Sequence, residues 1–255
     1  MEFTTLRIRH SPRILTVAIH RPEQQNAING TLLRELNLAL DLAESDPSCR
    51  FLVLEGQPGV FCTGMDFSEV ANHAGPTDEE KAKAFMQLLH RMSLTPKVVI
   101  ANVDGRVMAG GVGLAAASDF AISTERSQFS LSEALWGLLP ACVIPFLIRR
   151  VGFQKAYTMT LSTLPISASQ ALACSLIDEL TSDPADSIRR LLLRIGRLEE
   201  NTIVSLKAYF RKMWIITEQT ECEAVAEITR LVSDQTVRAS IEAFVKDRKL
   251  PWSTQ

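Results

Sequence analysis

Short apolar runs alternate with segments of helical periodicity along the first half of the chain, and this alternation limits the fold more than any other feature. Phe51–Leu54 and Lys97–Ala101 have the length and residue types of buried strands. Thr31–Glu44 places its apolar side chains on one helical face, and Glu79–Met92 is predicted as a second helix. Strands that alternate with helices form parallel βαβ units, so the sequence predicts an α/β fold.

The two ends of the chain depart from this pattern. Leu6–Ile8 and Ile14–Ile19 are rich in β-forming residues and are predicted to pair as an opening hairpin. Helices dominate the C-terminal part, with predicted segments Ala168–Leu172, Ala185–Arg197, Asn201–Glu218, Glu221–Ser233 and Thr236–Val245. We therefore divide the chain into a core of residues 1–195, which holds the active site, and a helical region of residues 196–255 for packing and subunit contacts.

Composition excludes several classes of protein. The formal charge of the 255 residues is −2, so no overall basic field attracts nucleic acid or a lipid surface. The first ten residues are charged where a signal peptide needs an apolar core, and no apolar run reaches the roughly 18 residues of a membrane span. We expect a cytoplasmic protein. The five cysteines are scattered without a CxxC pair, so neither a disulfide framework nor a metal site is expected.

Two glycine-containing turns lie where a predicted strand meets a predicted helix. They are Phe61–Asp66, with the sequence FCTGMD, and Gly105–Gly113, with the sequence GRVMAGGVG. Glycine lets the backbone approach a ligand closely, and N–H groups at the start of a helix stabilise negative charge. Two such groups aimed at one point make an oxyanion hole. Taken singly, each turn is more typical of tight packing than of catalysis.

Other glycine motifs are missing. Gly110–Gly113 does not match the GxGxxG dinucleotide fingerprint, and no Walker lysine follows it. The chain also has no GxSxG nucleophile elbow, which argues against a serine hydrolase of the α/β type.

Taken together, in their order and spacing, the two turns resemble those of the crotonase (enoyl-CoA hydratase/isomerase) superfamily. The matching elements are Arg21-Pro22, Asn26-Ala27, Leu52–Leu54, Phe61–Asp66, Gly105–Asp119, Phe129–Glu133 and Gly137–Pro140. The resemblance runs to about residue 180. It implies a crotonase-like ββα superhelix with a C-terminal helical region, assembled as a homotrimer or as a hexamer made of two trimers.

The resemblance also implies roles for residues of the two turns. Met65 and Gly110 are the expected oxyanion donors, and both act through the backbone N–H group. Gly64 and Gly111 are expected to contact the substrate beside them. Arg106, just before the second turn, is a candidate partner for a carboxylate of the substrate; a surface arginine is the alternative.

Hydratases of this family carry two glutamates. Here the first position holds Gly113 and only the second, Glu133, is a glutamate. A single carboxylate can move a proton between two carbons, or can take a Cα proton and return it to a leaving hydroxyl. Asp66 is a second candidate for assisting departure of the hydroxyl, and capping of its turn is the alternative role.

A closer resemblance is to the dehydratases of polyketide β-branching cassettes. It is carried by Phe129–Gly152, by Met159–Leu161 with Pro165–Ser167, and by Pro251-Trp252. It implies dehydration of a 3-hydroxy-3-methylglutaryl thioester, held on the phosphopantetheine arm of an acyl carrier protein, to the 3-methylglutaconyl thioester. No other cofactor and no metal are implied.

Two alternatives stay open at this point. One is hydration or double-bond isomerisation of a coenzyme A thioester by the single glutamate. The other is a catalytically silent crotonase that serves as an assembly subunit, and the glycine at position 113 is the best argument for it.

Overall fold

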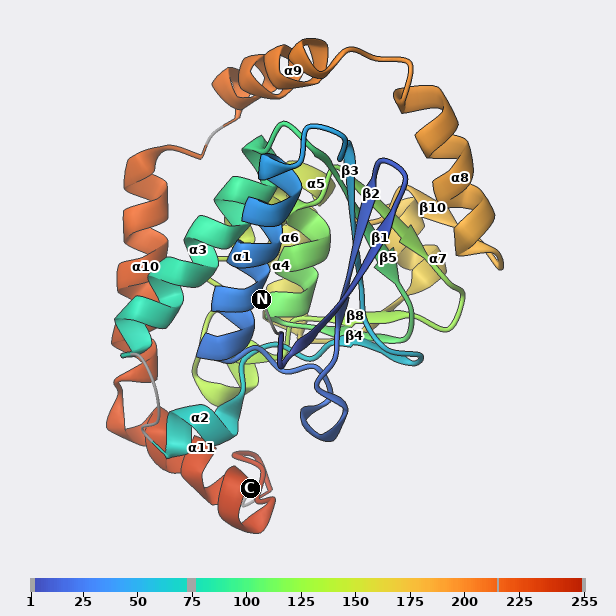
Figure 1. The fold of residues 1–255 in the computed structure, drawn as a ribbon. Helices are drawn as coiled ribbons and strands as arrows, with labels where there is room; N and C mark the ends of the chain where they lie inside the picture. The colour runs from blue at the N-terminus through green and yellow to red at the C-terminus, as the bar shows by residue number, and fades with distance from the viewer. Residues whose placement is uncertain (1–2, 73–76, 215, 254–255) are drawn as a thin grey trace.

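The computed structural model describes residues 3–72, 77–214 and 216–253, which form two sheets surrounded by helices (Figure 1). One sheet has the strand order β1-β2-β3-β5-β7-β10, and the other has the order β4-β6-β8-β9. The strands are β1 (Leu6–Ser11), β2 (Ile14–Ile19), β3 (Phe51–Glu55), β4 (Val60–Cys62), β5 (Val98–Val103), β6 (Arg106–Met108), β7 (Phe120–Ser123), β8 (Gln128–Ser130), β9 (Ile166–Ser167) and β10 (Glu179–Leu180).

Helices connect and cover these strands. The first group is η1 (Pro22–Gln24), α1 (Gly30–Ser45), α2 (Phe67–Ala71), α3 (Asp78–Leu94), α4 (Gly110–Ala117) and η2 (Glu133–Trp136). The second group is α5 (Ile144–Val151), α6 (Phe153–Ser162), α7 (Ala168–Ala173), α8 (Pro184–Ile195), α9 (Glu200–Met213), α10 (Glu218–Val232) and α11 (Gln235–Asp247). The predicted α/β class and its helical C-terminal region are confirmed.

The larger sheet begins with the predicted hairpin and continues in parallel. β1 and β2 are antiparallel, with Leu6 opposite Ile19, whereas β2, β3, β5 and β7 run parallel to one another. Alternate side chains of β3 enter different cores. Leu52 and Leu54 join the main core, whereas Phe51 and Val53 pack in a second cluster against the side chains of α8. Helices on both faces explain why the run is apolar throughout.

The smaller sheet sets the position of the functional segments. β4, β6 and β8 are neighbours and run parallel. The turn after β4 leads to α2, the turn after β6 leads to α4, and β8 leads to η2. Carboxyl ends of parallel strands meet at one edge of a sheet, so both glycine turns and Glu133 emerge at the same edge.

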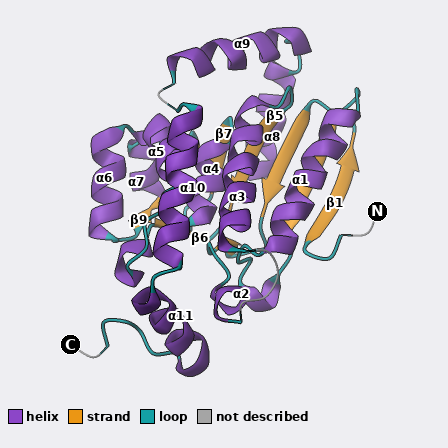
Figure 2. Ribbon diagram, turned by 90° about the vertical axis from the view of Figure 1, so that its left-hand side faces the viewer, coloured by secondary structure: helices purple, strands orange, loops and turns teal. Residues whose placement is uncertain are grey.

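The helices from α8 onward wrap around the outside of the body (Figures 1 and 2). α10 lies along α3, and α11 lies beside α2. The predicted helix Asn201–Glu218 is wrong at its end, because α9 stops at Met213. Thr217 then caps α10 through a reciprocal pair of hydrogen bonds with Thr220 and starts a new helix.

No helix in the described ranges is long and apolar enough to cross a membrane.

Candidate active site

The first glycine turn is shaped by the segment around Ile28. The Ile28 N–H donates to the carbonyl of Gly64 at 2.6 Å, and the Asp66 N–H donates to the carbonyl of Ile28 at 2.9 Å. Successive groups of an extended backbone point in opposite directions, so the N–H of Met65, between these two bonds, points away from Ile28. Met65 lines a cavity of about 600 Å³.

The second turn holds Ala109 in a conformation that side chains rarely adopt. Its φ is 51° and its ψ is −119°. This backbone conformation costs roughly 1–3 kcal/mol in a residue with a Cβ and persists only where the surrounding structure imposes it. Here the Ala109 N–H donates to the carbonyl of Ser130 at 2.9 Å, and its carbonyl accepts from Val112. Gly110 follows as the first residue of α4, so its N–H has no acceptor within the helix, and it lines the same cavity.

The two turns are pressed against each other. A Cβ added at Gly64, whose φ is +85°, would lie 2.5 Å from the Cβ of Ala109 and 3.3 Å from the nitrogen of Gly110. A Cβ added at Gly111 would lie 2.4 Å from the carbonyl oxygen of Cys62. Neither Gly64 nor Gly111 lines the cavity. Both glycines therefore allow close packing of the turns, and their contact with substrate remains a prediction.

Asp66 ties the first turn to the segment before α1. One oxygen of its buried carboxylate accepts from the N–H of Ser68 at 3.0 Å and caps α2. The other accepts from the Arg21 guanidinium at 2.8 Å, and Arg21 also donates to the carbonyl of Ala27. Asp66 lines the cavity, but both of its oxygens are used to hold the loop. The capping alternative is confirmed, and the catalytic role remains a prediction.

Asn26 also holds the first glycine turn in place. Its amide nitrogen donates to the carbonyls of Val60 and Phe61 at 3.1 and 3.2 Å, and its amide oxygen accepts from the N–H of Arg21 at 2.8 Å. The sequence analysis assigned no role to Arg21 or Asn26. Their signal was the Arg-Pro and Asn-Ala pairs between the hairpin and α1. The structure shows that the buried Asn26 and the partly buried Arg21 use their polar groups to hold the turn.

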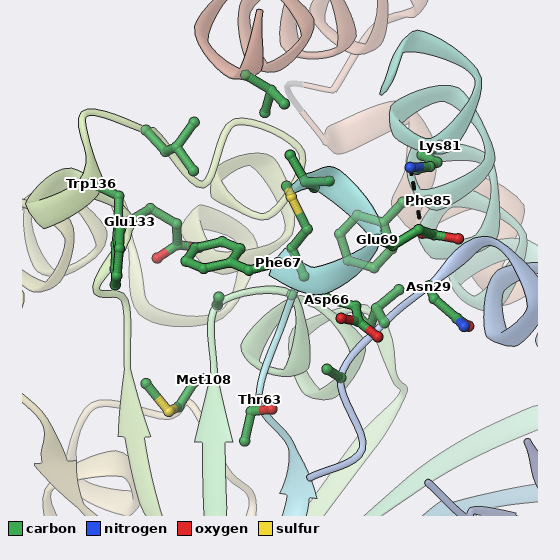
Figure 3. Close-up of a pocket in the computed structure, with 18 of the residues that line it drawn as sticks. Asn29, Thr63, Asp66, Phe67, Glu69, Lys81, Phe85, Met108, Glu133 and Trp136 are labelled. Atoms are coloured by element: carbon green, nitrogen blue, oxygen red, sulfur yellow. Dashed lines mark ion pairs between the residues drawn. The ribbon is translucent and has the colours of Figure 1, made fainter. Parts of the chain in front are cut away.

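Glu133 is the buried acid of the cavity. It begins η2, lies beside Trp136 and Phe67 (Figure 3), and lines the cavity with both turns. The residue keeps partial exposure, yet its Oε2 is buried and has no hydrogen-bond partner among the described residues. Burial raises the pKa of Glu133 to about 7. At neutral pH such a group can both accept and donate a proton.

Apolar side chains surround position 113. A Cβ added at Gly113 would lie 3.0 Å from Cγ2 of Val143, 3.3 Å from Cζ of Phe85 and 3.4 Å from Cδ1 of Leu89. The position of the family's second glutamate is therefore tightly packed against apolar groups, which would have to shift to admit a side chain.

The candidate carboxylate partner Arg106 lies outside the cavity. It is exposed at the start of β6 and does not belong to the cavity wall, whereas Val107 beside it is fully buried. The surface alternative describes its position in the structure, and its pairing with a substrate carboxylate remains a prediction. Of the residues that the structure describes, the cations in the cavity wall are Lys81 and Arg248.

The C-terminal helices complete the cavity. Ile228, Val232, Phe244, Val245 and Arg248 belong to its wall, so the site is not confined to residues 1–195. Aromatic rings link this wall to Glu133: Trp136 packs edge-on against Phe244 at 5.1 Å and against Trp252 at 5.8 Å, measured between ring centroids. This cover keeps water from the acid and explains its burial.

Within residues 3–72, 77–214 and 216–253, no group of three His, Cys, Asp or Glu side chains is arranged to hold a metal ion.

Comparison with known proteins identifies the family. The enoyl-CoA hydratase/isomerase family model matches residues 9–255. The chain belongs to this family. It is 36% identical over 255 residues to the bacillaene synthase dehydratase PksH of Bacillus subtilis, covering 99% of this chain and 98% of that protein. It is also 24% identical to a trans-2-decenoyl-[acyl-carrier-protein] isomerase of Streptococcus mutans, over 84% of this chain and 83% of that one.

A solved structure gives the same answer for the fold. The crystal structure of PksH from Bacillus subtilis, described as a polyketide biosynthesis enoyl-CoA hydratase, superposes with a TM-score of 0.91 at 35% identity. The match covers 98% of this chain and 100% of that one. The chain is therefore an enzyme of the enoyl-CoA hydratase/isomerase family with the crotonase fold, and its chemistry is that of a hydro-lyase.

Proposed function

We propose that the enzyme dehydrates 3-hydroxy-3-methylglutaryl-acyl carrier protein to 3-methylglutaconyl-acyl carrier protein during polyketide β-branching. The observation that carries this proposal is Glu133, a buried carboxyl with a pKa near neutrality that lines the cavity. At the position of the family's second glutamate the chain has Gly113, packed against apolar side chains. The similarity to a dehydratase of bacillaene synthase supports the polyketide setting.

In the proposed mechanism the thioester oxygen binds between the N–H groups of Met65 and Gly110. Negative charge develops on that oxygen as the Cα proton leaves, and two fixed donors stabilise it. Glu133 takes the Cα proton and then gives it to the tertiary hydroxyl at C3. The C–H bond and the C–O bond break, a C=C bond forms, and water leaves with the proton that Glu133 carried. Asp66 keeps the donor of Met65 in place.

The substrate arm is proposed to be phosphopantetheine of an acyl carrier protein, with no other cofactor. A carrier-protein substrate also appears in the name of the related isomerase from Streptococcus mutans. We further propose a homotrimer or hexamer. Large apolar side chains that such an assembly would bury are exposed on α6 and α9: Phe153, Tyr157, Leu161, Leu206, Tyr209 and Phe210.

Mass spectrometry of 3-hydroxy-3-methylglutaryl carrier protein tests the proposal. The wild type is expected to remove one water from the phosphopantetheine-bound acyl group, and Glu133→Gln is expected to leave it intact. The same assay with the coenzyme A thioester is the comparison. Turnover of the coenzyme A substrate alone would favour a coenzyme A hydratase or isomerase. Equal activity of Glu133→Gln and wild type would rule out the mechanism.

A further inference from the structure

Pro251-Trp252 is a part of the sequence pattern to which the proposed mechanism gives no role. Trp252 lies in a turn after α11 and packs edge-on against Trp136, with 5.8 Å between the ring centroids. The N–H and the hydroxyl of Ser253 both donate to the carbonyl of Leu250, at 3.1 and 2.7 Å, and close this turn. Trp252 does not belong to the cavity wall, so it acts on the site only through another side chain.

Trp136 connects Trp252 to the acid. Glu133 is the first residue of η2, and Trp136 is the last. Side chains three residues apart in a 3₁₀ helix lie one above the other, because this helix has three residues per turn. Trp136 therefore lies on the face of η2 that carries Glu133. Both residues line the cavity, and Figure 3 shows their side chains next to each other.

Two further rings connect Trp136 to the other elements of the site. The centroid of Trp136 lies 5.1 Å from that of Phe244 on α11 and 4.9 Å from that of Phe67 on α2, at interplanar angles of 72° and 76°. Phe67 directly follows Asp66, the cap of the turn that carries the oxyanion donor of Met65. Edge-to-face ring pairs add stability beyond the area that they bury. The rings therefore join the segment of the acid to the segment of the oxyanion turn.

η2 depends on these contacts for its place. It has four residues, and a helix of this length is not stable without contacts to other elements. Trp252 is the outermost ring of the cluster and is 41% exposed, so its replacement leaves the hydrophobic core intact. It covers the side of Trp136 that would otherwise face solvent at the end of the chain.

We propose that Trp252 is a positioning residue: through Trp136 it holds Glu133 in place relative to the oxyanion turn and keeps the acid out of water. This inference rests on the role of Glu133 in the proposed function. It adds the end of the chain to the parts of the molecule that the reaction needs.

The cover matters because burial governs the protonation of Glu133. Burial raises its pKa, and the other cause, a hydrogen bond from its own backbone, lowers it. Among the described residues, the other titratable groups in the cavity wall are Glu23, Asp66, Glu69, Asp78, Lys81, Arg248 and the thiol of Cys142. The elements packed against η2 carry Lys155 and Tyr157 on α6, Arg238, Glu242, Lys246 and Asp247 on α11, and Lys249 after it. None of these groups is a cause of the raised pKa, so loss of the cover is expected to lower it.

The pH dependence of kcat/KM on 3-hydroxy-3-methylglutaryl carrier protein tests the inference. Glu133 must be ionised to take the Cα proton, so kcat/KM of the wild type should rise with pH through the pKa of this acid. Trp252→Ala admits water and is expected to move that rise to lower pH by roughly one unit or more. It should also lower kcat while KM changes little. Trp252→Phe, which keeps a ring, is expected to restore most of the wild-type profile.

Val225→Ala is the matched control for a general loss of stability. Val225 is 8% exposed in the main core on α10 and does not line the cavity. Its truncation is expected to lower Tm without moving the rise of kcat/KM. If Trp252→Ala behaves in the same way, or does not differ from the wild type, Trp252 is not a positioning residue and the inference is overturned.

Urea denaturation separates the inference from the proposed function, because it needs no turnover. The change that Glu133→Gln causes in the urea midpoint should depend less on pH, between about pH 5 and about pH 8, in the Trp252→Ala background than in the wild type. A wild type that removes no water from the carrier-protein substrate would refute the proposed function. In that case the smaller pH dependence would still support the cover by Trp252, and an equal pH dependence would overturn it.

Discussion

The two walls of the cavity present different kinds of chemical group. The wall that carries Met65 and Gly110 presents backbone N–H groups, and its side chains serve to fix the backbone: Asp66 caps α2, and Gly64 allows the two turns to touch. The opposite wall presents side chains, with Glu133 beside Trp136. On the first wall a side chain can change without loss of the donor, as the methionine at position 65 illustrates.

This difference indicates where the reaction and its selectivity are decided. Backbone donors stabilise an oxyanion whatever the rest of the acyl group is, so they suit any thioester reaction through an enolate. Carboxylates and cations determine which bond breaks and which acyl group binds. In this chain Met65 and Gly110 line the cavity, and so does the acid Glu133, whereas position 113 on α4 holds a glycine.

The largest expected effect is on the side-chain wall. Glu133→Gln is expected to lower kcat by up to about 10⁴-fold, because general acid–base catalysis contributes up to that factor. KM should change little, since the amide has the shape of the carboxylic acid and the oxyanion donors are untouched. Steady-state kinetics with the carrier-protein substrate measures both constants. A rise in KM with an unchanged kcat would contradict the assignment of Glu133 to proton transfer.

A change in the backbone wall is expected to have the next largest effect. Gly111→Ala places a methyl group 2.4 Å from the carbonyl oxygen of Cys62 and must push the two turns apart. Displacement of one oxyanion donor lowers kcat by about 10²–10³-fold. Met65→Leu is the control, because it replaces a side chain and keeps the backbone. Equal losses in the two variants would show that the methionine side chain, and not its N–H, acts in catalysis.

The free energy of unfolding should depend on pH through Glu133 of the side-chain wall. The folded pKa of Glu133, about 7, lies above its ordinary value of 4.5, so the folded state retains a proton that the unfolded chain releases. Wild type therefore loses stability as pH rises from the ordinary pKa through the folded one. Glu133→Gln does not share this loss, so its advantage in unfolding free energy should grow by about 2–3 kcal/mol from about pH 5 to about pH 8. Urea denaturation at several pH values measures it, and an advantage independent of pH would contradict the raised pKa.

The smallest effect concerns Ala109 in the backbone wall. Ala109→Gly removes the cost of a positive φ at a residue with a Cβ and is expected to stabilise the fold by about 1 kcal/mol. Thermal denaturation measures the change in stability. Gly64→Ala, at φ +85°, is expected to destabilise the fold. A destabilised Ala109→Gly would show that the methyl group of Ala109 contributes more by packing than its conformation costs.

Local patterns in the sequence were enough to predict most elements of the fold. The apolar run at Phe51–Leu54 became β3, and the amphipathic segment Thr31–Glu44 became α1 with one more residue at each end. The junction between α9 and α10 was missed because helical residues continue through it. The cap at Thr217 starts a new helix, α10, and its sequence signal is a single side chain.

The part of the site that lies directly after strands could be predicted. Both turns and Glu133 follow strands, and they meet at one sheet edge. The exposure of Arg106 could not be predicted, because the direction of a side chain on a three-residue strand depends on the partners of that strand. Lys81 was missed because a lysine after Asp78, Glu79 and Glu80 is typical of a solvated helix start, whereas in the structure it pairs with Glu69 of α2 and lines the cavity.

Because α10 and α11 lie at the end of the chain, the part of the cavity wall that they contribute is synthesised last. A nascent chain that has left the ribosome only as far as α9 already contains both turns and Glu133, but it lacks Ile228, Val232 and Phe244. Because these side chains belong to the cavity wall, the cavity that encloses the acid is incomplete without them. The complete site therefore forms only when the last helices pack over chemistry that earlier segments have already put in place.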